Sequence, residues 1–368
     1  MFSQYVLILV WTGIVAVFAK YGQVNKTVLV DGVEEERFKW IFAFLAFFPV
    51  IFIAAYRPLD FGDSGAYFDK FVYSAPSSVD GISEFVDSQT KDKGFYVFMS
   101  LIKVFITKDG NMFFLILASI QGIILLSFYR YYSRDFVFSF FFFIASADYI
   151  NWMFNGTRQF TAAVIIIAAA PLLMKKKYVP LILVILFAST FHQSALIMLP
   201  MVFIVQGKAF NKKTLIFIAL IILAIVFVGR FTGWMDDSLQ DTQYSNVVTH
   251  YTSVGDDGTH PLRVLVYSVP TIIAIYGREK LKEQNNPVLN ICINMSIISS
   301  GLYVVSMVTS GLFLGRLPLY FSLYNYVLLP WEIKIIFEED MRKTINLAAI
   351  IFYLAFYVYQ VHFTWGLF

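Results

Sequence analysis

The sequence has a single cysteine, only four histidines and few charges in its 368 residues. Cys292 has no second cysteine to pair with, so disulfides within the chain are excluded and cysteine usage does not identify a redox compartment. The net charge of +3 is too small to indicate a nucleic-acid partner. The motifs of soluble enzymes are also missing: no phosphate-binding glycine loop, no His-Glu-x-x-His and no nucleophile elbow occurs.

Apolar residues dominate instead and make up 58% of the chain, against 14% for charged residues. Three uncharged apolar runs approach the ~20 residues that a membrane-spanning helix needs: 112–128, 214–229 and 344–359. No polar stretch is long enough to bury a core of its own. We therefore expect an all-α polytopic integral membrane protein in which residues 1–368 form a single transmembrane domain.

Hydropathy and sequence breaks predict about twelve transmembrane helices. They lie near residues 4–19, 40–56, 112–128, 136–150, 159–174, 178–191, 194–206, 214–229, 263–276, 288–308, 317–336 and 344–360. Basic connectors between spans favour the cytoplasmic side. Five basic or mixed connectors fall on alternate turns of the chain, so that one orientation places all of them inside: 130–134, 174–178, 207–213, 277–282 and 338–343.

The outer side then receives two long loops, about 57–94 and 230–262, both rich in aspartate. It also receives the short turns around Arg158, His192 and Arg316. The segment 94–107 is short for a span and contains Lys103. We expect it to form a short interfacial or re-entrant helix on the outer face, which a membrane permits where protein or water covers the backbone.

Three arginines stand at helix entries on this predicted outer side: Arg158, Arg263 and Arg316. A single arginine at a helix end can simply extend its guanidinium to water. That explanation does not account for three of them on the face that the positive-inside rule disfavours. A guanidinium binds phosphate oxygens bidentately and stays charged at every working pH, so we interpret the three as ligands of a diphosphate.

Other candidate side chains occur at the same predicted helix mouths. Asp60 and Asp63 begin the first outer loop and are either solvated charges or, within reach of a sugar hydroxyl, a general base. His192 is either a hydrogen-bonded helix-end residue or a group suited to proton transfer near neutral pH. His250 and His260 lie near Asp256 and Asp257, but this spacing matches no strong metal-ligand pattern, so we expect no metal.

Five short motifs resemble the EpsG-like branch of the Wzy-type polysaccharide polymerases of bacterial inner membranes. Their order and spacing, over roughly residues 40 to 330, carry the resemblance. They are Asp63–Tyr67, Lys93–Phe95, Asn155–Gln159, Phe191–Leu196, and Arg316 with Leu319–Phe321. The sequence departs from the family pattern ahead of the Gly-Phe pair, where Lys93 replaces the usual acidic residue and Asp92 stands one position earlier.

The resemblance implies a membrane glycosyltransferase that polymerises undecaprenyl-pyrophosphate-linked oligosaccharide repeat units at the periplasmic face of the bacterial inner membrane. Arg158 and Arg316 would bind the donor diphosphate, and Asp63 or His192 would take the proton from the acceptor hydroxyl. Further expected contacts to diphosphate or sugar are Arg263, Lys93, Asp60, Tyr67 and Gln159. No metal or other cofactor is required if arginines neutralise the diphosphate. Besides the lipid-linked glycan and membrane lipid, the implied partners are a chain-length regulator and a flippase.

Three alternatives remain open from the sequence. A lipid-linked glycan ligase would share the donor chemistry and differ only in the acceptor. A flippase or transporter of the same lipid-linked unit predicts charges within the spans, whereas here Asp148 is the main exception to their location at span ends and in loops. A membrane acyltransferase would need a histidine deep in a tunnel, which the predicted outer position of His192 does not suit.

Overall fold

The computed structural model describes residues 2–30, 33–227, 230, 233–234 and 258–367. Within these residues the chain is almost entirely helical, which confirms the all-α class. The strands described there form one antiparallel hairpin, β1 (Asn25–Val30) with β2 (Val33–Phe38), in which Asn25 pairs with Phe38. The sequence analysis did not predict this hairpin, because it lies in a connector between two spans.

The fold divides into two compact units, the first formed by Met1–Leu196 with Thr344–Phe368 and the second by Ile197–Lys343. The helices of the first unit are α1 (Phe2–Tyr21), α2 (Trp40–Ala55), α3 (Ser64–Asp69), η1 (Lys70–Ser74), η2 (Val79–Gly81), α4 (Ile82–Asp87), α5 (Lys93–Phe105), α6 (Gly110–Tyr132), α7 (Phe136–Ala145), η3 (Tyr149–Asn155), α8 (Thr157–Ala168), α9 (Ala170–Met174), α10 (Tyr178–Phe191) and η4 (Gln193–Ile197). The helix α19 (Glu339–Tyr359) and η7 (Gln360–Thr364) complete it.

The second unit packs around one central helix, α16 (Pro287–Met307), most of which is buried. Polar side chains link this helix to its neighbours: Asn294 Nδ2 donates to Val205 O at 2.9 Å, and Thr271 Oγ1 bonds Ser296 Oγ at 2.8 Å. The other helices of this unit are α11 (Met198–Ile204), α12 (Lys212–Val226), α14 (Pro261–Tyr276), α15 (Arg278–Glu283), η6 (Leu314–Arg316), α17 (Leu319–Ser322) and α18 (Asn325–Ile336).

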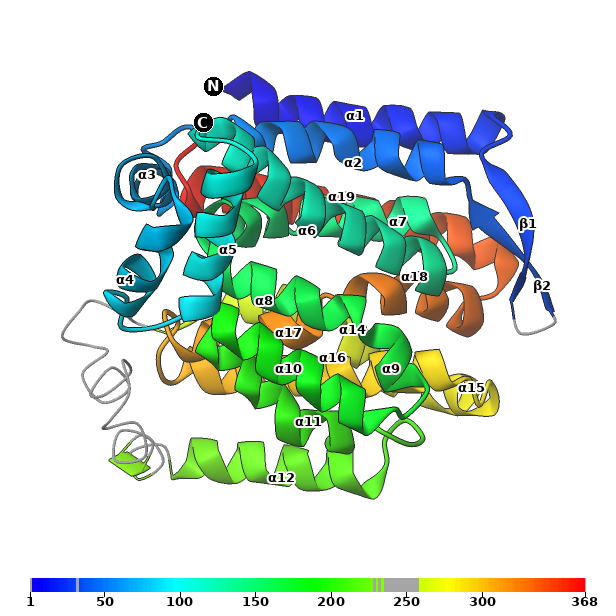
Figure 1. Cartoon of the computed structure of the whole chain (residues 1–368). Coiled ribbons are helices and arrows are strands. Elements are labelled where there is room, and N and C mark those ends of the chain that lie inside the picture. The colour runs from blue at the N-terminus through cyan, green and yellow to red at the C-terminus, as the bar shows by residue number, and fades with distance from the viewer. Residues whose placement is uncertain (1, 31–32, 228–229, 231–232, 235–257, 368) are drawn as a thin grey trace. The chain divides into compact units, whose positions relative to one another are not determined.

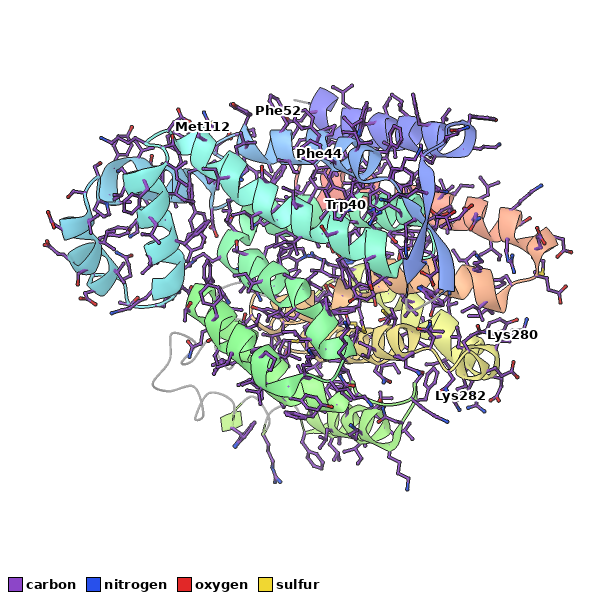
Figure 2. All side chains as sticks on the ribbon, turned by 45° about the vertical axis from the view of Figure 1, so that its right-hand side comes forward. Trp40, Phe44, Phe52, Met112, Lys280 and Lys282 are labelled. Atoms are coloured by element: carbon purple, nitrogen blue, oxygen red, sulfur yellow. The ribbon has the colours of Figure 1, made fainter. Side chains whose placement is uncertain are left out.

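Over its described residues, each of the twelve predicted spans corresponds to helical segments, and residues 228–229 of the span 214–229 lie outside them. Four helices of the described residues are long and apolar enough to cross a membrane unaided. They are Gln4–Tyr21, Gly110–Tyr132, Pro287–Met307 and Glu339–Thr364. Several other predicted spans consist of shorter apolar helices, and the count of twelve crossings stays a prediction. Large apolar side chains on the surface suit contact with lipid, as on the outward face of α2, where Trp40, Phe44 and Phe52 are exposed (Figure 2).

The predicted span 136–150 is interrupted. The helices α7 and η3 meet at an angle of 71° across Ser146–Asp148, where Ala147 adopts the left-handed conformation with φ of 57°. Burial of Ala147 and Asp148 shows that this break lies inside the protein rather than against lipid, as irregular backbone in a membrane requires. The bend redirects the chain so that η3 leads directly into α8 and Arg158.

The first unit has two different ends. At one end the hairpin contacts the last turn of α6, where Arg130 Nε donates to Phe38 O and Arg37 Nη1 donates to Ser133 O. At the other end lie α3, α4 and the start of α5, together with the ends of α2 and α10 (Figure 1). Within this unit the basic connector 130–134 is therefore at the end opposite the predicted outer turns around Arg158 and His192, as the alternation of basic connectors requires.

Short helices build most of the predicted outer loop 57–94, so it is not an open loop. The segment 94–107 is helical as predicted, and α5 buries Phe95, Met99 and Ile102 against the protein. The charge that makes this segment unusual, Lys103, donates to Val72 O at 2.8 Å and Ala75 O at 2.7 Å. Lys103 thus satisfies the carbonyls at the end of η1. The interfacial or re-entrant placement of α5 stays a prediction.

Cysteine labelling tests the two ends. Tyr73 is 78% exposed beside α5, and Lys177 is exposed in the turn between α9 and α10, at the other end of helices that begin or finish near Arg158. We expect a membrane-impermeant maleimide to label Tyr73→Cys on intact cells and Lys177→Cys only after permeabilisation. The native Cys292 is buried and supplies little background. Labelling of both positions from one side would contradict the predicted orientation.

Candidate functional site

Four of the five motifs that the sequence analysis singled out meet around one side chain, that of Arg158. The motifs lie on α3, at the start of α5, on α8 and at the end of α10, and all belong to the first unit. Their residues are far apart in the sequence, with 91 positions between Tyr67 and Arg158 and 101 between Asp92 and Gln193. In the sequence these motifs are related only by their order and spacing. The structure shows that their residues are in direct contact.

Arg158 stands in the first turn of α8 and is held on two sides. Its Nε donates a hydrogen bond of 2.8 Å to the hydroxyl of Tyr67, and its Nη1 lies 2.7 Å from Oδ2 of Asp92 in an ion pair. The rings of Tyr67 and Tyr96 lie 5.8 and 5.9 Å from the guanidinium carbon, within the range of cation–π attraction. The side chain of Arg158 is 19% exposed and that of Asp92 only 1%.

Asp92 precedes α5 in the left-handed conformation, with φ of 55°. Aspartate tolerates this region better than most residues, and the turn directs its carboxylate inward. Gln193 N donates to Oδ1 at 3.3 Å, while Oδ2 faces Arg158. Burial raises the pKa of the Asp92 carboxyl above its ordinary value, although the charge of Arg158 and the Gln193 N–H act in the opposite direction. Arg158 is thus the main group that favours the ionised form of Asp92.

Tyr67 supplies a neutral hydroxyl. Burial raises the pKa of Tyr67 to about 12, even though the nearby Arg158 opposes the shift. At neutral pH the phenol therefore keeps its proton, accepts from Arg158 and retains one hydrogen for donation to another group. The predicted substrate-contact residue Tyr67 is in this way a direct partner of the predicted diphosphate ligand.

A second small network begins one residue after Arg158. Gln159 Nε2 donates to Ser194 Oγ at 3.2 Å, and Ser194 Oγ lies 2.7 Å from Nδ1 of His192. Gln159 is buried, whereas His192 is half-buried at the end of α10. The structure therefore brings His192 and Gln159 close to the contacts of Arg158, because Gln193, which bonds Asp92, stands between His192 and Ser194 in the sequence.

Two glycines allow the segments to approach. A Cβ on Gly94 would lie 2.0 Å from Oγ1 and 2.6 Å from Cβ of Thr190, so α5 and α10 meet at a position where only glycine fits. Gly62 has a φ of 50°, and a Cβ there would lie 2.3 Å from Oδ1 of Asn155. The first of these glycines places Asp92 beside Gln193, and the second places α3 beside the start of α8.

The sequence analysis missed Arg57. This arginine is buried at the end of α2, where Nε donates to Ser64 Oγ at 2.8 Å, Nη1 donates to Ala54 O at 2.7 Å, and the ring of Phe114 lies 3.8 Å from its Cζ. Ser64 belongs to the motif Asp63–Tyr67, so Arg57 fixes the first turn of α3, which carries Tyr67. The available signal was the position of a charge directly after an apolar run, next to that motif.

The remaining carboxylates of the first loop are solvent-exposed. Asp60 and Asp63 are exposed, and Asp63 precedes α3 without a side-chain bond to the helix. Lys93 is also exposed and forms a surface ion pair of 3.0 Å with Asp87. Asp92 rather than Lys93 therefore provides the charge that faces Arg158, one position earlier than the family pattern leads one to expect.

Arg263 and Arg316 belong to the second unit, within which the segments that carry them touch. Thr259 N donates to Ser306 O at 3.0 Å, and Ser306 Oγ donates to Thr259 Oγ1 at 2.8 Å, which joins the start of α14 to the end of α16. A Cβ on Gly315 would lie 2.5 Å from Thr259 Oγ1, so η6 packs on the same segment. The expectation that these arginines share a site with Arg158 stays a prediction.

Most of the second predicted outer loop, 230–262, lies outside the described residues, and so do His250, Asp256 and Asp257. His260 is described and caps α14, with Leu262 N donating to its Nδ1 at 3.3 Å. In the part of the chain that the structure covers, no three His, Cys, Asp or Glu side chains are grouped so that they could hold a metal ion.

Comparison with known proteins gives one match. The model of the EpsG family matches residues 40–365, which is most of the chain and includes all five motifs. No curated protein and no solved structure shows a significant match.

The ion pair predicts a pH-dependent stability. Because burial raises the pKa of Asp92 in the folded state, the folded form binds this proton more tightly, and its stability falls as pH rises from the ordinary aspartate range through the folded pKa. Arg158→Ala removes the opposing charge and raises that pKa further. We expect it to cost about 3 kcal/mol near neutral pH, because it leaves a buried charge unpaired.

Thermal unfolding of purified protein between about pH 4 and pH 8 is the measurement, with pH 4 near the ordinary aspartate pKa. The deficit of Arg158→Ala relative to wild type should grow with pH and should disappear in the double variant Arg158→Ala/Asp92→Asn. The control is Lys93→Ala, which breaks an exposed pair and should cost well under 1 kcal/mol. A deficit independent of pH would show that Asp92 does not depend on Arg158.

Proposed function

Because the chain belongs to the EpsG family, a family of Wzy-like polymerases, we propose that it is a membrane glycosyltransferase that polymerises undecaprenyl-pyrophosphate-linked oligosaccharide repeat units. Membership of the family supports a role as a polysaccharide polymerase-type membrane protein. The identity of the lipid-linked substrate is what the proposal adds. The observation that carries it is the guanidinium of Arg158, held by Tyr67 and Asp92 where four motifs meet.

Arg158 is suited to bind the diphosphate of the lipid-linked donor. A guanidinium has five N–H donors, and within the described part of the chain Tyr67 and Asp92 engage only its Nε and Nη1. Nη2 remains to donate to a phosphate oxygen. The position of Arg158 in the first turn of α8 adds the partial positive charge of a helix N-terminus, which attracts anions. Arg316 and Arg263 would bind the same diphosphate or that of the acceptor.

In the proposed reaction, a hydroxyl of the acceptor sugar attacks the anomeric carbon of the donor. The new glycosidic C–O bond forms as the bond from that carbon to the diphosphate oxygen breaks, and the diphosphate leaves with the electron pair. Arg158 stabilises the charge that develops on this oxygen, which is the kind of electrostatic stabilisation that lowers a barrier most. A base takes the hydroxyl proton, and Asp63, which is exposed, or His192, which bonds Ser194, has the role.

Asp92 is a positioning residue in this scheme. Its carboxylate fixes the direction of the guanidinium before substrate binds, so that Arg158 need not be ordered during the reaction. Asp92 also lowers the net positive charge at the site, so a diphosphate must compete with this carboxylate for the guanidinium of Arg158. We assign the site to the periplasmic face of the bacterial inner membrane, with a flippase supplying the lipid-linked unit and a chain-length regulator acting on the product.

Polymerisation can be measured with purified protein and a lipid-pyrophosphate-linked oligosaccharide, with product length resolved on a gel. Wild type should give a ladder of longer glycans. We expect Arg158→Ala, Arg316→Ala and Asp63→Asn to abolish the ladder while the proteins remain folded. Bound lipid substrate without extension by wild type would contradict polymerisation and favour a ligase or a flippase.

A pair of tyrosine variants tests whether the hydroxyl of Tyr67 serves Arg158. Tyr67→Phe removes the acceptor of the Arg158 Nε hydrogen bond, so the initial rate should fall by roughly tenfold, the value of one charge-assisted hydrogen bond. Tyr96→Phe is the matched control, because its ring also faces Arg158 but Nε donates to Tyr67. If the two variants lowered the initial rate equally, the hydroxyl of Tyr67 would have no specific role at Arg158.

A further inference from the structure

At the end of the first unit away from Arg158, the chain forms a partly open polar pocket of about 330 Å³. Four segments line it: the last turn of α1, the hairpin, the end of α6 and the first turn of α7. We call this cavity the hairpin pocket. Nothing in the proposed glycosyl transfer uses it, since the motifs around Arg158 lie on other helices, α3, α5, α8 and α10, at the other end of the first unit.

Positive charge predominates in the hairpin pocket. Its basic lining residues are Lys20, Arg37, Arg130 and Arg134, and its acidic lining residues are Glu36 and Asp135. The carboxylate of Asp135 is engaged, because its Oδ1 accepts from Phe138 N at 3.1 Å and caps α7. Glu35 lies outside the lining and bridges Arg37 and Arg134. Four cations thus face two acids in the lining, and with Glu35 included the positive charges still outnumber the negative ones by four to three.

The arginines of the hairpin pocket are built into the fold. Arg130 is buried, and its Nε is fixed by Phe38 O. Arg37 is held by Ser133 O and Glu35, yet its buried Nε has no hydrogen-bond partner among the described residues. An unsatisfied buried guanidinium N–H is costly and indicates a missing acceptor. An anion in the hairpin pocket would provide that acceptor.

The surroundings of the hairpin pocket place it at the level of lipid headgroups. Trp40 is 48% exposed with Arg130 4.6 Å from its ring, and exposed Tyr21 and Tyr131 each lie against a cation of the pocket. Tryptophan and tyrosine gather where a membrane meets water. From Trp40 the outward face of α2 continues with exposed apolar side chains such as Phe44 (Figure 2). Acyl chains on this face would present their headgroup to the pocket.

We propose that the hairpin pocket binds the phosphodiester of an anionic phospholipid headgroup, with Lys20 and Arg134 at its rim and Arg130 and Arg37 beneath. Basic pockets between membrane helices bind anionic headgroups in this way. The bound lipid joins α1, the hairpin and α2 to α6 and α7 at their common end. The hairpin pocket is separate from the proposed diphosphate site around Arg158. Its ligand also differs, because the phospholipid is bound without being chemically changed.

Native mass spectrometry of the purified protein tests the proposal. Protein is equilibrated with equal amounts of phosphatidylglycerol and phosphatidylcholine, then delipidated in steps. Wild type should retain one phosphatidylglycerol in preference to phosphatidylcholine. Lys20→Gln/Arg134→Gln should weaken that retention on the order of tenfold, from the loss of two charges near the headgroup. Both substitutions leave the hydrogen bonds of Arg130 and Arg37 to the backbone intact.

The control Lys175→Gln/Lys177→Gln removes the same charge from the exposed turn before α10 and should retain the lipid. Glu36→Gln makes the pocket more positive and should strengthen retention, which keeps the test decisive if the first variant folds poorly. Equal retention of the two lipids, or equal losses in both double variants, would overturn the proposal. Displacement of the lipid by millimolar inorganic phosphate would also overturn it, because the ligand would then be a free anion.

Discussion

The ion pair between Arg158 and Asp92 is the interaction on which the arrangement of the candidate site depends. Two opposite charges with little access to water are costly to separate and costly to leave alone, so each fixes the position of the other. Around them four segments must come to a common point, and each contributes a contact of a different kind: a phenol from α3, a carboxylate before α5, the guanidinium on α8 and a backbone N–H after α10. The glycine at position 94 then becomes necessary, because α5 reaches this point only by touching Thr190.

The two ends of the first unit use arginine in different ways. At the hairpin end, backbone carbonyl oxygens and Glu35 hold the arginines, and exposed aromatic rings lie against them, an arrangement that suits a membrane surface. At the other end, Arg158 has a single carboxylate and a neutral phenol, and part of its donor capacity is left for a ligand. Charge count alone does not distinguish these environments. The distinction comes from the groups that hold each guanidinium, which are mainly backbone carbonyl oxygens at the hairpin end and side chains around Arg158.

Hydropathy predicted the helices well, because an apolar run of sufficient length must bury its backbone in a helix wherever it lies. The positions of Arg158 and His192 at helix mouths, and the family resemblance for Gln159, made these three predicted site residues, and the structure brings them into two neighbouring networks. The sequence analysis did not predict Asp92 as the partner of Arg158, since a loop aspartate gives no signal of the left-handed turn that directs it inward. The break at Ala147 was also missed, because Ser146–Asp148 contains neither glycine nor proline. The hairpin was not predicted for a similar reason. Apolar and polar residues alternate only weakly along its strands, and its contacts with α6 stabilise it.

The path of the chain through the first unit has a consequence for biosynthesis. The helix η3, which leads into Arg158, is completed by residues made much later: Tyr149 bonds Tyr357, 208 positions on, and Asn151 bonds Trp365, 214 positions on. The second unit is synthesised between these partners. A nascent chain therefore leaves η3 without its final neighbours until α19 and η7 have been synthesised. Chains truncated before residue 357 lack those partners altogether, so the fold couples assembly of the site to synthesis of α19 and η7.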